Sequence, residues 1–181
     1  MRVIAGKYRS RGLSSLAGTD IRPTSDRLRE ALFNVLTAGN PQALEGSTWL
    51  DLFAGTGAVG IEALSRGAAM VRFVESSAPA VGVIRKNLRS LGINSGFEIL
   101  QQDVARGLEG LPGADFVFVD PPYRLAAAYT QALTALSEKA VGLVITEHQK
   151  RFDPGAEFGG LQRFRLLKQG DAALSFYRLP G

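Results

Sequence analysis

The sequence predicts an α/β fold in which helices cover both faces of a mostly parallel sheet. Three observations lead to this prediction. Apolar runs typical of buried strands alternate with segments of helical spacing, and a glycine-rich turn joins an early strand to a helix. The last two apolar runs flank a hairpin signal at Gln169-Gly170-Asp171. Strands separated by helices pair in parallel, and the closing hairpin adds an antiparallel edge.

Composition narrows the class of protein. The chain has 181 residues, which favours one domain with a complete core. It contains no cysteine and a single histidine, His148, so disulfides and typical zinc sites are excluded and no metal is expected. No apolar run approaches the roughly 20 residues needed to span a bilayer, and no signal peptide is evident. We therefore expect a cytoplasmic protein without a membrane partner.

Positive charge is concentrated at one end of the chain. Residues 1–30 contain seven basic and three acidic residues, so this stretch alone accounts for the net charge of +4. A polyanion is the natural partner of such a basic arm. A solvated, partly mobile terminus would have the same composition, and charge alone leaves both interpretations open.

The first 41 residues predict a hairpin and then a helix. Short apolar runs at 1–8 and 11–13 flank a basic turn region and indicate the hairpin. Pro23 favours extended backbone before it, and Thr24 or Ser25 can then cap a helix that ends at Gly39-Asn40-Pro41. The apolar positions of this helix follow the i, i+3, i+4 rule: Leu28, Ala31, Leu32, Val35 and Leu36.

The remaining elements follow in alternation. Four further strands are predicted before the closing hairpin, at 70–75, 97–101, 116–119 and 143–147. Helices are predicted at 58–64, 78–91 and 126–139. The hairpin strands are predicted at 164–168 and 173–178.

The stretch from Trp49 to Gly60 predicts a nucleotide-like cofactor site. It begins as a buried strand and turns on Gly55 and Gly57 into a helix, which places backbone N–H groups and a positive helix end against a ligand. Acidic residues follow four of the strands at or near their carboxyl ends: Asp51, Glu75, Asp103 and Asp120. Ligands of parallel sheets bind outside these ends, so we expect the four side chains to meet there.

Two cofactor classes fit the glycine-rich turn. Gly55 to Gly60 matches G-x-G-x-x-G, and Glu75 lies 20 residues after Gly55, as in dinucleotide-binding folds. However, Asp51 would face an anionic pyrophosphate, which is unfavourable. The same carboxylate is favourable beside a cation, and S-adenosylmethionine carries an ammonium and a sulfonium without any phosphate. These residues favour S-adenosylmethionine.

The motif Asp120-Pro121-Pro122-Tyr123 points to methyl transfer onto an amine. The lone pair of an exocyclic amine on a nucleobase is delocalised into the ring. A carboxylate and a proline-flanked carbonyl can accept hydrogen bonds from that amine, and Asp120 can assist proton loss. Tyr123 offers a face on which a base turned out of its helix could stack. The alternative is a Pro-Pro turn that merely ends a strand.

These motifs resemble a known family. Asp51 to Gly57 together with Asp120 to Tyr123 resembles the class I, S-adenosylmethionine-dependent amino-methyltransferases. The block from Arg22 to Asn34, with the opening Met1 to Tyr8, is similar to the bacterial 16S ribosomal RNA guanine-N2 methyltransferases of the RsmD type. The similarity extends over essentially the whole chain. It implies a Rossmann-like sheet of seven strands with an antiparallel last strand, and an N-terminal β-hairpin that helps to hold RNA.

The resemblance also implies roles for individual residues. The cofactor would contact Asp51, Phe53, Gly55, Gly57, Glu75 and Asp103, with Glu75 at the ribose and Asp103 at the adenine. The target base would contact Asp120, Pro121 and Tyr123. RNA would be held by Lys7, Arg9, Arg11 and Arg22. We expect a hairpin extension at 1–20, a methyltransferase domain at 21–181, and a monomer acting on 16S rRNA, free or within the 30S subunit.

Three other functions share part of this pattern: a nucleic-acid adenine-N6 methyltransferase, a protein-glutamine methyltransferase and a non-catalytic RNA-binding module. The first usually needs a target-recognition region, for which the residues between Gly60 and Asp120 leave little room. Among other residues, Glu62 is expected on a solvent-facing side of a helix and Trp49 in the core. Glu147 and His148 are expected to have a structural or rim role.

Overall fold

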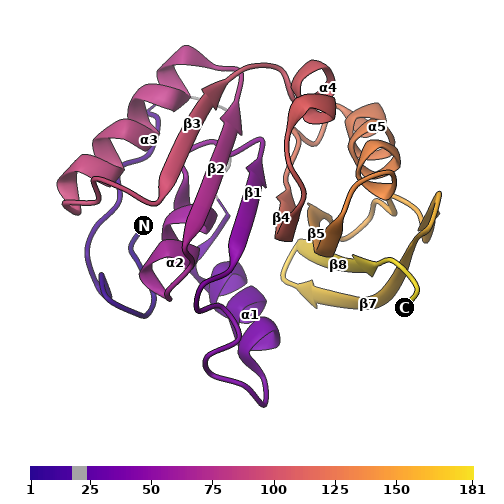
Figure 1. Cartoon of the computed structure of the whole chain (residues 1–181), viewed down its shortest axis with the longest axis horizontal. Coiled ribbons are helices and arrows are strands. Elements are labelled where there is room, and N and C mark those ends of the chain that lie inside the picture. The colour runs from indigo at the N-terminus through magenta and orange to yellow at the C-terminus, as the bar shows by residue number, and fades with distance from the viewer. Residues whose placement is uncertain (18–23) are drawn as a thin grey trace.

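The computed structural model describes residues 1–17 and 24–181 and contains one mixed sheet (Figure 1). Its strands lie in the order β3-β2-β1-β4-β5-β8-β7-β6, and β1 to β5 pair in parallel. Their bounds are β1 Thr48–Leu52, β2 Met70–Glu75, β3 Phe97–Gln101, β4 Ala114–Val119 and β5 Val141–Gln149. The antiparallel strands are β6 Glu157–Phe158, β7 Leu161–Gln169 and β8 Ala172–Arg178. The predicted α/β fold with a mostly parallel sheet is confirmed.

The helices connect the parallel strands. They are α1 Asp26–Thr37, α2 Ala58–Ser65, α3 Ala78–Ser90, α4 Val104–Gly107, the 3-10 helix η1 Leu108–Gly110, and α5 Ala126–Ser137. The sequence did not indicate α4 or η1, because one turn each is too short to show helical periodicity. The three helices and six strands predicted after the glycine-rich turn are present, with ends that differ by a few residues.

The prediction of seven strands was wrong, because the sheet has eight. The additional strand, β6, consists of two residues that pair with Leu161 and Gln162 of β7. Such a short strand leaves no alternation in the sequence to detect. Three C-terminal strands are therefore antiparallel instead of one or two.

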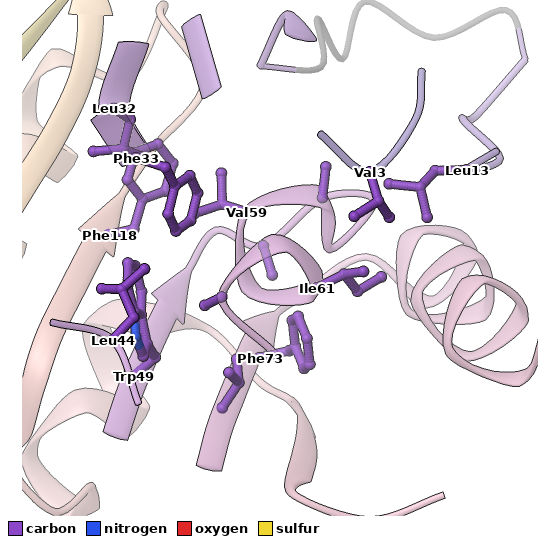
Figure 2. Packing of buried hydrophobic residues seen from close by; sticks show 14 of the residues in the cluster. Val3, Leu13, Leu32, Phe33, Leu44, Trp49, Val59, Ile61, Phe73 and Phe118 are labelled. Carbon is purple, nitrogen blue, oxygen red and sulfur yellow. The ribbon is translucent and has the colours of Figure 1, made fainter. Parts of the chain in front are cut away.

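Helices cover both faces of the sheet, as predicted. One face packs against α1, α2, α3 and the N-terminal segment, and the other against α4 and α5. Trp49 is fully buried on the first face, where its ring stacks on Phe33 and Phe116. The expected core position of Trp49 is confirmed. Figure 2 shows this part of the core, with Phe33 and Phe118 beside the tryptophan.

The N-terminal segment forms a bridged loop instead of a hairpin of two strands. A single bridge joins Arg2 and Gly12, and the Val3 N–H donates to the Arg11 carbonyl at 2.9 Å. Val3 and Leu13 point into the same core as Ile61 of α2 (Figure 2). The segment is therefore part of the fold, fixed on α2. The predicted domain boundary at residue 20 lies outside the described residues and stays a prediction.

Glu62 explains how α2 fixes that segment. Its carboxylate is fully buried and accepts hydrogen bonds from the Ile4 and Ala5 N–H groups at 2.9 and 3.0 Å. It also pairs with Arg66 at 2.9 Å and with the buried Arg29 at 3.6 Å. The prediction that Glu62 faces solvent was wrong, because its partners come from a segment almost 60 residues away. Among the helices that the structure describes, none is long and apolar enough to cross a bilayer.

Candidate functional site

The loop between β1 and α2 has the strained geometry that its glycines permit. Gly55 and Gly57 have φ angles of +58° and +79°, and Phe53 also has a positive φ of +58°. A side chain at Gly57 would approach Phe73 and Ile84 at 3.3 Å, so Gly57 lies against the core and does not line the cavity described below. Gly55 and Phe53 do line it. Gly57 therefore shapes the loop, and Gly55 brings backbone to the ligand side.

A cavity of about 740 Å³ opens at the carboxyl ends of β1, β2 and β4. Its volume suits a nucleoside-sized ligand. Its lining brings together the four acidic residues that the sequence singled out: Asp51, Glu75, Asp103 and Asp120. Among the described lining residues, Arg124 is the one cationic side chain. Such a cavity suits a cationic ligand and disfavours the pyrophosphate of a dinucleotide.

Asp51 is the most enclosed of the acids at the cofactor end. It is 2% exposed, and its Oδ2 accepts a hydrogen bond from the Gly60 N–H at 3.0 Å. Burial raises the pKa of Asp51 to about 8, with a further contribution from the charge of Glu75, while the Gly60 hydrogen bond lowers it. A cation in the cavity would favour the ionised carboxylate.

Glu75 and Asp103 are oriented by backbone N–H groups. Glu75 accepts from Gly55 at 2.9 Å and from Ser77 at 3.1 Å, which ties the end of β2 to the glycine loop. Asp103 caps α4 by accepting from the Ala105 N–H at 2.8 Å. Carboxylates held in this way retain lone pairs for ligand hydroxyl or amino groups.

Asp120 directly follows β4 and lies beside a buried acid, Glu147. The Thr24 hydroxyl donates to Glu147 Oε2 at 2.6 Å and lies 3.5 Å from Asp120 Oδ2. Burial raises the pKa of Asp120 well above its usual value, and the charges of Glu147 and Asp51 raise it further. The carboxyl groups of Asp51, Asp120 and Glu147, from the ends of β1, β4 and β5, therefore interact electrostatically beside the cavity.

Sequence reasoning missed the parts played by Thr24 and Glu147. Thr24 was a candidate helix cap, but Ser25 caps α1 by accepting from the Leu28 N–H, and Thr24 contacts the site instead. Glu147 also lies near Tyr123, whose hydroxyl is 3.4 Å from Glu147 Oε1. The signal available in the sequence was an acid at the end of an apolar strand, as at Asp120.

The predicted RNA-binding residues of the arm lie away from this cavity. The Lys7 N–H donates to the carbonyl of Ser65, the last residue of α2, and Arg11 donates to the carbonyl of Ser90, the last residue of α3. Both helices begin at the carboxyl ends of the parallel strands, where the cavity lies. Their last residues therefore lie at the opposite, amino ends of the strands. Lys7, Arg9 and Arg11 are exposed there. Arg22 lies outside the described residues.

Comparison with known proteins shows the family of this chain. The family described as Conserved hypothetical protein 95 matches residues 1–178. The chain belongs to this family. Ribosomal RNA small subunit methyltransferase D of Haemophilus influenzae is 35% identical over 187 residues, covering 99% of this chain and 92% of that protein. The Escherichia coli protein of the same description is 37% identical over 126 residues, covering 68% of this chain and 61% of its own.

Solved structures agree with the sequence relatives. The Escherichia coli protein yhhF has a TM-score of 0.83 and 27% identity, covering 100% of this chain and 98% of its own. The Haemophilus influenzae protein HI0767 has a TM-score of 0.78 and 30% identity, covering 99% and 98%. The resemblance to RsmD-type methyltransferases and the class I methyltransferase fold are thereby confirmed. The fold and family support S-adenosylmethionine as the cofactor of the cavity.

Proposed function

We propose that this protein transfers a methyl group from S-adenosylmethionine to the exocyclic N2 amine of a guanine in 16S ribosomal RNA. The observation that carries the proposal is one cavity lined both by the glycine loop with Asp51 and by Asp120 to Tyr123. Relatives described as rRNA small subunit methyltransferases support ribosomal RNA as the substrate. The proposal includes a monomeric enzyme that acts on free 16S rRNA or on the 30S subunit.

The residues of the cavity fit this cofactor. It supplies an electrophilic methyl group on a sulfonium when bound. Asp51 and the backbone around Gly55 would hold the amino-acid end, beside Phe53, and Gly57 would support the loop from beneath. Glu75 would accept hydrogen bonds from ribose hydroxyls, and Asp103 from the adenine side. The scarcity of cationic side chains in the cavity supports a cofactor without phosphate.

Asp120 and Pro121 would act on the target amine. An Asp120 oxygen and the Pro121 carbonyl would accept the two amine hydrogens, which turns the nitrogen lone pair toward the donor. Since the product nitrogen is cationic until it loses a proton, Asp120 would then accept that proton. The neighbouring carboxyl of Glu147 increases the proton affinity of Asp120, because two close carboxylates repel each other.

Tyr123 would hold the base. Its ring lines the cavity and its hydroxyl lies 3.4 Å from Glu147 Oε1, which limits how far the ring can turn. A flipped base could stack on this ring, as enzymes that act on bases commonly require. Stacking accepts any base, so the choice of guanine must come from hydrogen bonds to its edge.

The test is labelled methyl transfer from S-adenosylmethionine to purified 16S rRNA and to 30S subunits, followed by nucleoside analysis. We expect label in N2-methylguanosine, in one of the two substrates or both. Label in N6-methyladenosine would overturn the target base, and label in protein would overturn the RNA substrate. An Asp120→Ala variant with normal cofactor binding is the matched control, because its signal should be lost.

A further inference from the structure

A second, smaller cavity lies on the C-terminal part of the sheet. It has a volume of about 170 Å³, and four cationic side chains line it: Lys150, Arg151, Arg163 and Lys168. These residues come from the end of β5 and from β7, which are separated in sequence but joined through β8. No charge run in the sequence marks this cluster, because β-sheet pairing assembles it.

Three of the four cations are available to a ligand. Arg163 is engaged with Asp153, which accepts from its two terminal nitrogens at 2.7 and 3.3 Å. Lys150, Arg151 and Lys168 are exposed, and none forms an ion pair within the described residues. The main chain of Lys150 is fixed, since its N–H donates to the Asp171 carbonyl at 2.8 Å. Asp153, which lines the cavity, and the nearby Asp171 are the acids that reduce this positive field.

His148 forms the buried wall of the second cavity and contributes no charge. Its Nδ1 lies 2.9 Å from the Gln149 carbonyl and its Nε2 lies 2.8 Å from Ser175 Oγ, so both ring nitrogens have partners. Burial lowers the pKa of His148 and keeps the ring neutral. The expected structural role of His148 accords with these contacts. The positive charge of the second cavity therefore comes from lysine and arginine and does not depend on neutral-range pH.

The second cavity lies at the same ends of the strands as the methyl-transfer cavity, that is, at the carboxyl ends of the parallel strands. Asp120 directly follows β4 and Glu147 lies near the end of β5, and Lys150 follows Glu147 by three residues, at most about 10 Å of extended chain. Tyr129 connects the two sites: its hydroxyl donates to the Glu147 carbonyl at 2.8 Å, and its ring packs on Phe152 of the second cavity.

We propose that the cations of the second cavity bind neighbouring backbone phosphates of the RNA strand whose base enters the methyl-transfer cavity. Acidic side chains line the methyl-transfer cavity and repel phosphates, and Arg124 is the one cation among the described lining residues, so the strand needs further cationic contacts close beside it. Lys7, Arg9 and Arg11 of the N-terminal arm do not supply them, because they lie at the opposite, amino ends of the parallel strands. Lys150, Arg151 and Lys168 supply them at the same ends of the strands as the target site. This inference rests on the proposed function, since it takes RNA as the substrate.

The test measures the affinity for an RNA fragment that carries the target nucleotide, at several salt concentrations, for wild type and for the triple variant Lys150→Ala, Arg151→Ala, Lys168→Ala. The slope of log affinity against log salt should fall by about 2, because each contact to a single-stranded phosphate contributes roughly 0.7. Affinity for S-adenosylmethionine, measured by calorimetry, should stay within a few-fold and shows that the variant is folded.

A matched triple variant removes the same charge elsewhere. Arg85, Lys86 and Arg89 are exposed on α3 and line neither cavity, so their replacement by alanine should leave the slope unchanged. Equal slopes for wild type and the 150/151/168 variant, or equal losses in both triple variants, would overturn the inference. Neither result would affect the proposed function, which the nucleoside analysis of wild-type methyl transfer tests separately.

Discussion

The two cavities lie at the carboxyl ends of the parallel strands and differ in volume and in the charge of their lining. The larger is lined by four carboxyl groups, two of them with pKa values raised by burial. The smaller is lined by four cations, three of them exposed and without ion pairs among the described residues. Buried acids suit a cationic cofactor and proton acceptance, whereas exposed cations suit a polyanion. The difference indicates that chemistry and substrate binding are carried by separate side chains.

The N-terminal arm is a third region. It shows that the distribution of charge along the sequence does not predict where the charged side chains lie in the fold. Residues 1–30 hold charge equal to the whole net charge, yet Lys7 and Arg11 are tied to the ends of α2 and α3, away from Asp120. The C-terminal cations carry no such signal and lie beside the site. Lys7, Arg9 and Arg11 can contact a long RNA, but Lys150, Arg151 and Lys168 lie nearer the target base.

The largest expected effect is on chemistry. Asp120→Ala should lower the single-turnover rate of methyl transfer by about 100-fold or more, the scale of losing a positioned acid–base or acceptor group. Affinity for cofactor and RNA should change little. The measurement is rapid-quench transfer at saturating RNA, with the exposed Glu138→Ala as control. A rate within a few-fold of wild type would mean that Asp120 is not catalytic.

A smaller effect is expected on cofactor binding. Glu75→Ala should weaken S-adenosylmethionine binding by roughly 10- to 100-fold, because hydrogen bonds to a charged group contribute about 1.5–3 kcal/mol. Calorimetry checks this, with Glu138→Ala again as control. The same experiment with NAD should show no binding. Tight binding of NAD would contradict the account of the acidic cavity.

Cofactor affinity should also depend on pH through Asp51. Its pKa of about 8 means that the ligand-free protein holds a proton there below pH 8, and a cationic ligand must displace it. Affinity should therefore rise by roughly 50-fold between pH 6 and pH 8 and level off above pH 8. The same raised pKa makes the ligand-free protein less stable as pH rises from about 4 toward 8. Calorimetry in buffers of different ionisation enthalpy would detect the released proton.

Asp51→Asn is the control for that titration, because asparagine cannot titrate. Its cofactor affinity should be weaker and independent of pH over this range. A wild-type affinity that is flat between pH 6 and pH 8, without proton release, would show that Asp51 is already ionised in the free protein.

The smallest effect concerns the arm. Replacing Lys7, Arg9 and Arg11 by alanine should lower the salt slope of binding to long rRNA fragments by about 2–3 units, roughly one per phosphate contact. A short fragment around the target should show almost no change, because the arm lies at the far edge. An equal loss with short and long RNA would place the arm near the target base and contradict the contrast between the regions.

The features of this fold that depend on local sequence pattern could be predicted from the sequence. Strand alternation, the glycine loop and the acids at the strand ends follow from spacing, and the structure brings Asp51, Glu75, Asp103 and Asp120 to one cavity. What it could not show depends on distant contacts. Thr24 meets Glu147 across 123 positions. The cluster at Lys150 and Lys168 exists only because β8 lies between β5 and β7.

The most direct test of the separation between chemistry and binding is steady-state methyl transfer to the same RNA by two variants. We predict that Asp120→Ala has a much lower kcat and an unchanged KM for RNA. The 150/151/168 triple variant should have a raised KM for RNA, which low salt brings partly back toward the wild-type value. Loss of kcat in the triple variant, insensitive to salt, together with a raised KM in Asp120→Ala, would contradict the account.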